Sequence, residues 1–292
     1  MEKRFVLDNK ILQILNNLIT RVIVKSNKIF HEATSFMRVI PDFLVIGNSF
    51  CCKTLLYNHM IQHPLVIENL REETSFWIYY YDRGMMWYKS NFPTLFHKKI
   101  LKLIYKKEAH VGETINIRSQ ETPFLIHKIL SEPKIIVILR NPIERTYVRY
   151  LADVRAGIEK RKFEDALEHP KPRSPILKKM KMNKIDGIDE NTSLYISGSI
   201  YSYDLKRWND FFPLKKMLFL TSEELIKDPL ATVNKALKFL GLEPLKTIKK
   251  VGQNFEENAD EINPEIRNKL QKFFESYNKQ LFDLIGKKLD WE

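Results

Sequence analysis

The first residues with the types and spacing for chemistry lie in a loop after the apolar run at positions 43–46. The loop reads Gly47-Asn48-Ser49-Phe50-Cys51-Cys52-Lys53-Thr54. This spacing matches the phosphate-binding pattern Gly-x4-Gly-Lys-Ser/Thr, except that Cys52 replaces the second glycine. Backbone N–H groups at a helix N-terminus bind phosphate, and a lysine adds charge. The loop therefore indicates an anion site in which Lys53 supplies the cation and Thr54 a hydroxyl. An ordinary strand-to-helix turn is the alternative interpretation.

A second candidate follows the apolar run 135–139, which leads directly into Arg140-Asn141-Pro142. An arginine can hold a phosphate through two parallel hydrogen bonds. Proline is well suited to the first turn of a helix, so a helix is expected to continue through residues 143–155. Arg140 is thus a candidate phosphate ligand, with a plain surface ion pair as the alternative.

Both motifs need elements that bring them together. Three apolar runs at 43–46, 135–139 and 217–220 are each followed by a helical pattern. Such runs are typical of buried strands, and strand–helix alternation predicts a parallel sheet with helices on both faces. Ligands in these folds lie beyond the carboxyl ends of the strands. Ser222 is the predicted N-cap after the third run, and Gly241 is predicted to end the helix at 232–240.

Composition limits the class of protein. The chain has 292 residues, of which 44% are hydrophobic, so it corresponds to one large domain or two small ones. Its two cysteines are adjacent, which excludes a disulfide framework and a cysteine-rich zinc site. The net charge of +12 favours anionic partners, although AT-rich codon usage explains it equally well. Nucleic-acid binding would rest on this charge alone, because no motif supports it.

The N-terminal region forms a separate part of the prediction. Apolar residues recur on one helical face between positions 11 and 24, but polar residues interrupt them, and the stretch is too short to span a membrane. No signal-peptide cleavage site is seen. We expect a helical extension over residues 1–40 and a single domain over 41–292. The extension either docks on that domain or lies on a membrane surface. The expected location is the cytoplasm, with peripheral membrane attachment only in the second case.

Longer segments resemble the PAPS-dependent sulfotransferases, where PAPS is 3′-phosphoadenosine 5′-phosphosulfate. The similarity runs in order through residues 41–64, 84–93, 135–150, 201–242 and 284–292. It includes Pro41-Asp42-Phe43-Leu44-Val45-Ile46-Gly47, Gln62-His63-Pro64, Arg140-Asn141-Pro142-Ile143-Glu144-Arg145 and Phe239-Leu240-Gly241-Leu242. The branch that it most resembles contains the bacterial and heparan-sulfate-type enzymes.

The resemblance implies a P-loop-like three-layer α/β sandwich with a central parallel sheet flanked by helices. It also implies transfer of a sulfuryl group from PAPS, as co-substrate and without a metal, to a hydroxyl or amine of a small molecule or carbohydrate. The 5′-phosphosulfate would lie in the loop 47–54, and Arg140, Val148 and Tyr201 would belong to the rest of the nucleotide site. Glu73 aligns with the catalytic base, and Glu113 aligns with a glutamate that supports the site.

Several departures from the family pattern fall on the chemistry. Phe50 stands where the family has its loop lysine, Cys52 where it has a glycine, Ser75 where it has a histidine and Val148 where it has a serine. Two hypotheses remain open. In the first, Lys53 takes over the phosphosulfate and the enzyme is active. In the second, the chain is a catalytically inactive binding protein.

A third hypothesis is an ATP-dependent kinase that uses Lys53 and Thr54. The sequence disfavours it, because no apolar strand ends in an aspartate that could hold Mg²⁺. Acceptor specificity is expected in the loops 79–91 and 171–191. Aromatic residues in and beside the first loop could line an acceptor cleft for a sugar or a ring, or they could belong to the core: Trp77, Tyr79, Tyr80, Tyr81, Trp87 and Tyr88.

Overall fold

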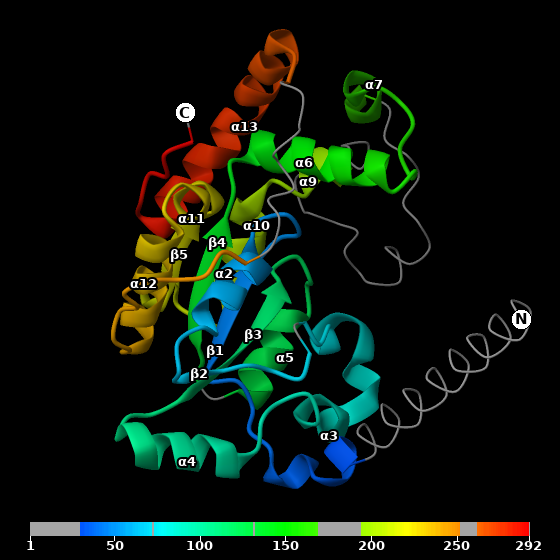
Figure 1. Ribbon diagram of the computed structural model, residues 1–292. Helices are drawn as coiled ribbons and strands as arrows, with labels where there is room; N and C mark the ends of the chain where they lie inside the picture. Colours follow the sequence, from blue (N-terminus) through cyan, green and yellow to red (C-terminus); the bar gives the residue numbers. More distant parts are fainter. Residues whose placement is uncertain (1–29, 72, 131, 169–193, 252–261, 292) are drawn as a thin grey trace, which may run out of the picture.

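The computed structural model describes residues 30–71, 73–130, 132–168, 194–251 and 262–291 (Figure 1). Most of the predicted extension 1–40 lies outside these residues, as does the predicted specificity loop 171–191. Within the described part, no helix is both long and apolar enough to cross a membrane.

The centre of the molecule is a sheet of parallel strands. Its order is β2 (Val66–Ile67), β3 (His110–Asn116), β1 (Phe43–Gly47), β4 (Lys134–Leu139) and β5 (Leu218–Thr221). Every residue of β1 is buried, as is every residue of β4 after Lys134. Burial on both faces explains why these strands have continuous apolar runs instead of alternating ones.

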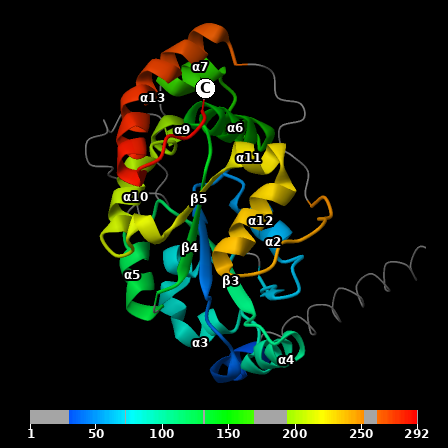
Figure 2. The same ribbon diagram turned by 90° about the vertical axis from the view of Figure 1, so that its left-hand side faces the viewer.

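Helices cover both faces of this sheet, so the predicted three-layer α/β fold is confirmed (Figure 2). One side carries α2 (Lys53–Met60), α11 (Ser222–Lys227) and α12 (Pro229–Leu240), and the other carries α5 (Thr122–Ile129), α10 (Tyr201–Asn209) and α13 (Pro264–Ile285). The remaining helices are α3 (Gly84–Lys89), α4 (Leu95–Tyr105), α6 (Pro142–Arg155), α7 (Phe163–Glu168) and α9 (Leu194–Ser197). Short helical turns are η1 (Ser35–Met37), η2 (Phe76–Tyr80), η3 (Tyr81–Arg83) and η4 (Leu214–Lys216).

Helix ends follow local sequence signals, with one correction. Pro142 begins α6, and Gly241, with φ of 86°, ends α12, as predicted. The predicted N-cap Ser222 is wrong by one residue. The Thr221 hydroxyl caps α11 by accepting a hydrogen bond from the Glu224 N–H at 3.1 Å. The Glu224 carboxylate accepts one from the Thr221 N–H, which completes a capping box. Ser222 is instead the first helical residue, and its hydroxyl donates to the carbonyl of Leu139.

Candidate active site at the carboxyl edge of the sheet

The predicted phosphate loop joins the end of β1 to the start of α2. Gly47 lies so close to β4 that a Cβ would come within 2.5 Å of the Ile138 carbonyl oxygen, so a side chain is excluded there. Phe50 and Cys52 both have left-handed backbones, with φ of 70° and 58°. Left-handed residues let a loop turn successive N–H groups toward an anion, but they cost about 1 kcal/mol or more when the residue is not glycine.

Polar side chains hold this loop in place. The Asn48 carboxamide oxygen accepts from the Ser49 N–H at 2.8 Å, and its NH2 group donates to the carbonyl of Gly198. Asn116, at the end of β3, donates to the Ser49 hydroxyl at 3.2 Å. The loop is therefore tied both to the neighbouring strand and to the turn after α9.

Arg145 lies beneath the loop, and sequence reasoning gave it no role. This buried side chain donates from Nε to the Ser49 carbonyl at 3.2 Å and from Nη1 to the Tyr195 carbonyl at 3.0 Å. Burial lowers the pKa of Arg145 to about 10, so it remains charged at neutral pH. Gly198 leaves room for the guanidinium. The spacing of the arginines at positions 140, 145 and 149 was the signal that could have revealed it.

Arg140 is buried at the end of β4, which excludes the plain surface ion pair considered from the sequence. Its Nη1 donates to the Phe50 carbonyl at 3.1 Å. The Tyr201 hydroxyl donates to the Arg140 carbonyl at 2.9 Å and lies 3.6 Å from the Cys51 sulfur. Two of the predicted nucleotide-site residues outside the loop, Arg140 and Tyr201, are therefore joined to the loop and to each other.

Lys53 and Glu73, the two predicted catalytic residues, are in direct contact. Lys53 Nζ lies 2.6 Å from Glu73 Oε2, and the side chains are 9% and 32% exposed. Lys53 begins α2, whereas Glu73 belongs to the segment before η2. The ion pair therefore brings two distant parts of the chain together beside the phosphate loop.

Glu113 supports the Glu73 segment from below. This buried carboxyl on β3 accepts hydrogen bonds from Trp77 Nε1 at 3.0 Å, from the Tyr88 hydroxyl at 2.6 Å and from the Thr74 hydroxyl. Burial raises the pKa of Glu113 to about 7, and the three hydrogen bonds partly offset that rise. Since Thr74 adjoins Glu73 in the chain, Glu113 anchors the base predicted from the sequence.

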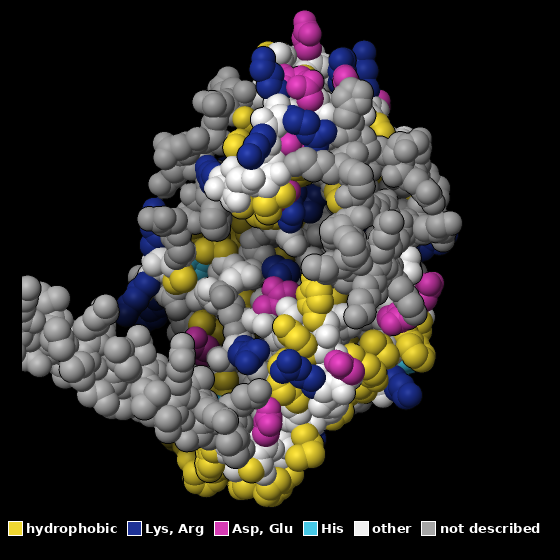
Figure 3. Space-filling view, turned by 90° about the vertical axis from the view of Figure 1, so that its right-hand side faces the viewer, with side chains coloured by type: hydrophobic (Ala, Val, Ile, Leu, Met, Phe, Trp, Pro, Cys, Tyr) yellow, Lys and Arg dark blue, Asp and Glu magenta, His cyan; other side chains and the backbone are white. Residues whose placement is uncertain are grey.

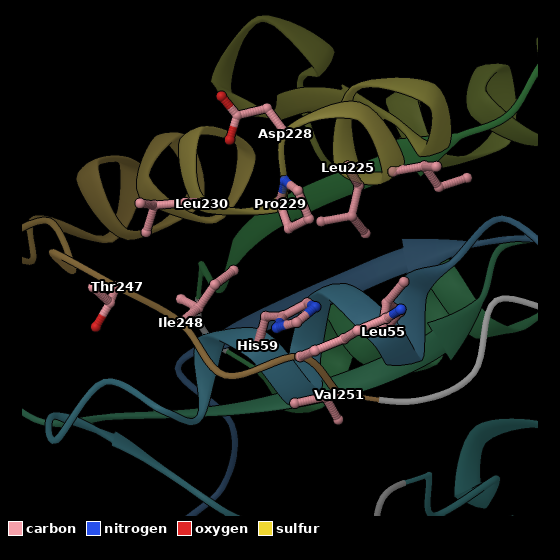
Figure 4. Close-up of a pocket in the computed structure, with 11 residues that line it drawn as sticks. Leu55, His59, Leu225, Asp228, Pro229, Leu230, Thr247, Ile248 and Val251 are labelled. Atoms are coloured by element: carbon pink, nitrogen blue, oxygen red, sulfur yellow. The ribbon is translucent and has the colours of Figure 1, made fainter.

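A cavity of about 520 Å³ lies against α2 on the side of α11 and α12. Figure 4 shows Leu55 and His59 of α2 facing Pro229 and Leu230 across it. Its other lining residues are Leu225, Ile226, Asp228, Thr247, Ile248, Lys250 and Val251. The cavity thus adjoins the same helix whose first residue is Lys53, and its walls are mostly apolar.

Two further predicted residues, Thr54 and Val148, make none of the described side-chain hydrogen bonds. Thr54 is the second residue of α2, and Val148 is buried in α6. Of the predicted aromatic residues, Trp77, Trp87 and Tyr88 are buried, while Tyr79 and Tyr81 are exposed. In the described part of the chain, no group of three metal-binding side chains is placed to hold an ion.

Comparison with known proteins identifies the family. The model of the sulfotransferase domain matches residues 59–267, which is more than half of the chain. A human heparan sulfate glucosamine 3-O-sulfotransferase 3B1 is 23% identical over 277 residues, covering 87% of this chain and 65% of the human protein. A bifunctional heparan sulfate N-deacetylase/N-sulfotransferase 1 from Caenorhabditis briggsae is 25% identical over 284 residues, covering 85% of this chain and 30% of that protein.

Solved structures agree at the level of the fold. A sulfotransferase from Alicyclobacillus acidocaldarius superposes with a TM-score of 0.61 at 22% identity, covering 86% of this chain and 98% of that one. The family model, which matches more than half of the chain, makes the assignment. The chain belongs to the PAPS-dependent sulfotransferase family.

Proposed function

We propose that the chain transfers a sulfuryl group from PAPS to a hydroxyl or amine of a carbohydrate or small molecule. The observation that carries this proposal is the Lys53–Glu73 contact beside the phosphate loop. A cation for the donor and a carboxylate for the acceptor proton are thereby placed within one hydrogen bond of each other. The heparan sulfate enzymes among its relatives favour a glycan as the acceptor.

The residues present fit the donor. The phosphate loop has the left-handed residues that an anion cradle requires, and cationic side chains surround it: Lys53, Arg140 and Arg145. The apolar cavity beside α2 has the size and lining for the purine base. When bound, PAPS supplies the sulfuryl group and a phosphate leaving group.

Each catalytic residue then has one task. Lys53 neutralises charge on the phosphosulfate, and this electrostatic stabilisation supplies most of the rate in reactions with a spread-out anionic transition state. Glu73, which is partly open to solvent, accepts the proton of the acceptor hydroxyl or amine. Arg140 and Arg145 hold the loop carbonyls at Phe50 and Ser49, and so fix the cradle before the donor binds.

An inactive binding protein is the second candidate, and one observation favours it. Phe50 aligns in sequence with the family's loop lysine, and the Arg149 guanidinium carbon lies over its ring, 5.4 Å from the ring centroid. In that case the Lys53–Glu73 pair would be a structural contact only.

Two measurements separate these functions. We expect the desulfated product, 3′-phosphoadenosine 5′-phosphate (PAP), to bind at micromolar concentration in calorimetric titrations at low salt. Labelled PAPS should then transfer its sulfuryl group to members of a glycan and amine panel, and Glu73→Gln should abolish transfer. The control is Glu108→Gln, which removes an exposed carboxylate paired with Lys102. PAP binding without transfer to any acceptor would favour the binding protein, and no binding at millimolar PAP would overturn the nucleotide site altogether.

A further inference from the structure

Helix α4 turns its apolar side outward. Phe96, Ile100, Leu103 and Ile104 are spaced as one helical face, yet Leu103 is 80%, Phe96 68% and Ile104 64% exposed. No residue of α4 is buried, and Leu101 is the one that packs partly against the core. An amphipathic helix ordinarily buries this face, so its exposure indicates a surface that has a partner.

The same end of the molecule exposes further apolar side chains. Phe36 and Met37 of η1 are exposed, and Arg38 pairs through its backbone with Thr94, the N-cap of α4. Figure 3 shows yellow side chains gathered at the lower end of the molecule, on the face opposite to α4, which Figure 1 places at the lower left. We define the α4 surface as Phe36, Met37, Phe96, Ile100, Leu103 and Ile104.

Lysines border this surface. Helix α4 and the turn after it contain Lys98, Lys99, Lys102, Lys106 and Lys107. Asp42, Glu108 and Glu243 pair with Lys98, Lys102 and Lys107. Lys99 and Lys106 make none of the described ion pairs, so the border keeps a net positive charge. An apolar face with basic flanks is the pattern of a helix that lies in the interface of a bilayer.

Charge decides between the possible occupants. Residues 1–29 contain six basic and two acidic residues, so this segment has the same sign as the α4 surface. A second copy of the chain would likewise bring two positive borders together. A nucleic acid would satisfy the lysines but leave the apolar stripe exposed to water. We propose that the α4 surface docks on an anionic lipid bilayer.

Docking at this place leaves the candidate active site accessible. Lys98 of α4 contacts both carboxylate oxygens of Asp42 at 2.6 and 2.7 Å, and Asp42 directly precedes β1. The phosphate loop follows the other end of that strand. The bilayer and the site therefore lie at opposite edges of the sheet, and the site faces away from the lipid. This proposal does not depend on the proposed function.

Co-sedimentation of the full chain with sucrose-loaded vesicles tests the proposal. One vesicle set is phosphatidylcholine alone. In the other, about 30% of the lipid is phosphatidylserine, so that the surface is anionic. Phe96→Ser/Leu103→Ser removes apolar contact, and Lys99→Glu/Lys106→Glu reverses two charges. Lys272→Glu/Lys279→Glu on α13 is the matched control, because it makes the same charge change on exposed residues at the other end of the molecule.

The wild-type chain should prefer the anionic vesicles, and either α4 variant should lower the partition coefficient by about tenfold or more, while the α13 control keeps the wild-type value. Circular dichroism melting of each variant confirms that it is folded. Equal sedimentation of wild type and α4 variants would overturn the proposal. It would also be overturned if the chain ignored lipid and formed a dimer, in analytical ultracentrifugation, that the α4 variants dissociate.

Discussion

Lys53 Nζ and Glu73 Oε2 lie 2.6 Å apart, so the cation expected to hold the donor is paired with the carboxylate expected to activate the acceptor. Lys53 is largely buried, and its single charge lies between the Glu73 carboxylate and the loop proposed to receive the donor's anionic groups. An anion that enters the loop must therefore share Lys53 with Glu73 or displace Glu73 from it. Donor binding would then release the carboxylate at the time when a base is needed.

This competition predicts opposite effects on PAP affinity for the two residues. Lys53→Ala removes a charged contact, so it should weaken PAP binding by about 2 kcal/mol in calorimetric titration. Glu73→Gln removes the competing charge, so PAP should bind as tightly as in the wild type or several-fold more tightly, although transfer is lost.

The matched controls are Lys102→Ala and Glu108→Gln, which break an exposed ion pair at the other edge of the sheet and should change neither measurement. If Glu73→Gln weakens PAP binding as much as Lys53→Ala, the two residues act as one structural unit. The competition would then not exist.

The left-handed backbone at Cys52 predicts a stabilising substitution. Cys52→Gly should raise the free energy of unfolding by about 1 kcal/mol in urea titration, because glycine adopts φ near 58° without a steric penalty. Lys106→Gly, at the C-cap of α4 with φ of 52°, is the control and should give a similar gain. Only Cys52→Gly should also change PAP affinity. A loss of stability at Cys52 alone would show that its side chain contributes more than the backbone strain costs.

Gly198 offers a test of the buried arginine beneath the loop. A Cβ at this position would clash with the Arg145 guanidinium. Gly198→Ala should therefore move Arg145 away from the Ser49 carbonyl and weaken PAP binding at least several-fold, measured by calorimetry. The control Gly157→Ala imposes strain at φ of 70° with open space around it, so it should lower stability by about 1 kcal/mol without changing PAP affinity. If Gly198→Ala leaves the PAP affinity unchanged, the contact of Arg145 with the loop does not contribute to PAP binding.

Local patterns were enough to predict the strands β1, β4 and β5 and the helices that follow them, because continuous apolar runs and helix ends are recognisable from neighbouring residues. The strands β2 and β3 were not predicted. The former has only two residues, and the latter contains Glu113, Thr114 and His110, which interrupt the apolar pattern. The N-cap of α11 was predicted one residue too late. Threonine and serine are both good N-caps, and only the capping box with Glu224 selects Thr221 over Ser222.

The candidate site was predictable only in part. Lys53, Glu73 and Arg140 follow from motif positions, and the structure brings the first two together. The supporting contacts of Arg145 and Glu113 join residues 25 to 96 positions apart in the chain, and no local pattern encodes such distances. The resemblance implied a supporting role for Glu113, but the contacts of both buried side chains depend on the packing of several elements and are seen only once the fold is assembled.

Glu113 predicts how stability depends on pH. Its pKa is about 7 in the folded chain against a usual value of 4.5, because burial favours the neutral carboxyl. The folded state therefore binds more protons than the unfolded state between these values. The stabilisation that this group contributes is fully present below pH 4.5 and is lost as the pH rises through 7. Its full size is on the order of 3 kcal/mol.

Urea unfolding at pH 5 and pH 8 measures this loss. The Glu113→Gln variant has no proton to release, so the fall in unfolding free energy between the two pH values should be smaller in it than in the wild type. Glu108→Gln is the control, because neighbouring Lys102 already lowers the pKa of that exposed carboxylate and it is ionised at both pH values. An undiminished fall in Glu113→Gln would mean that Glu113 is ionised throughout this range. The hydrogen bonds from Thr74, Trp77 and Tyr88 would then outweigh its burial.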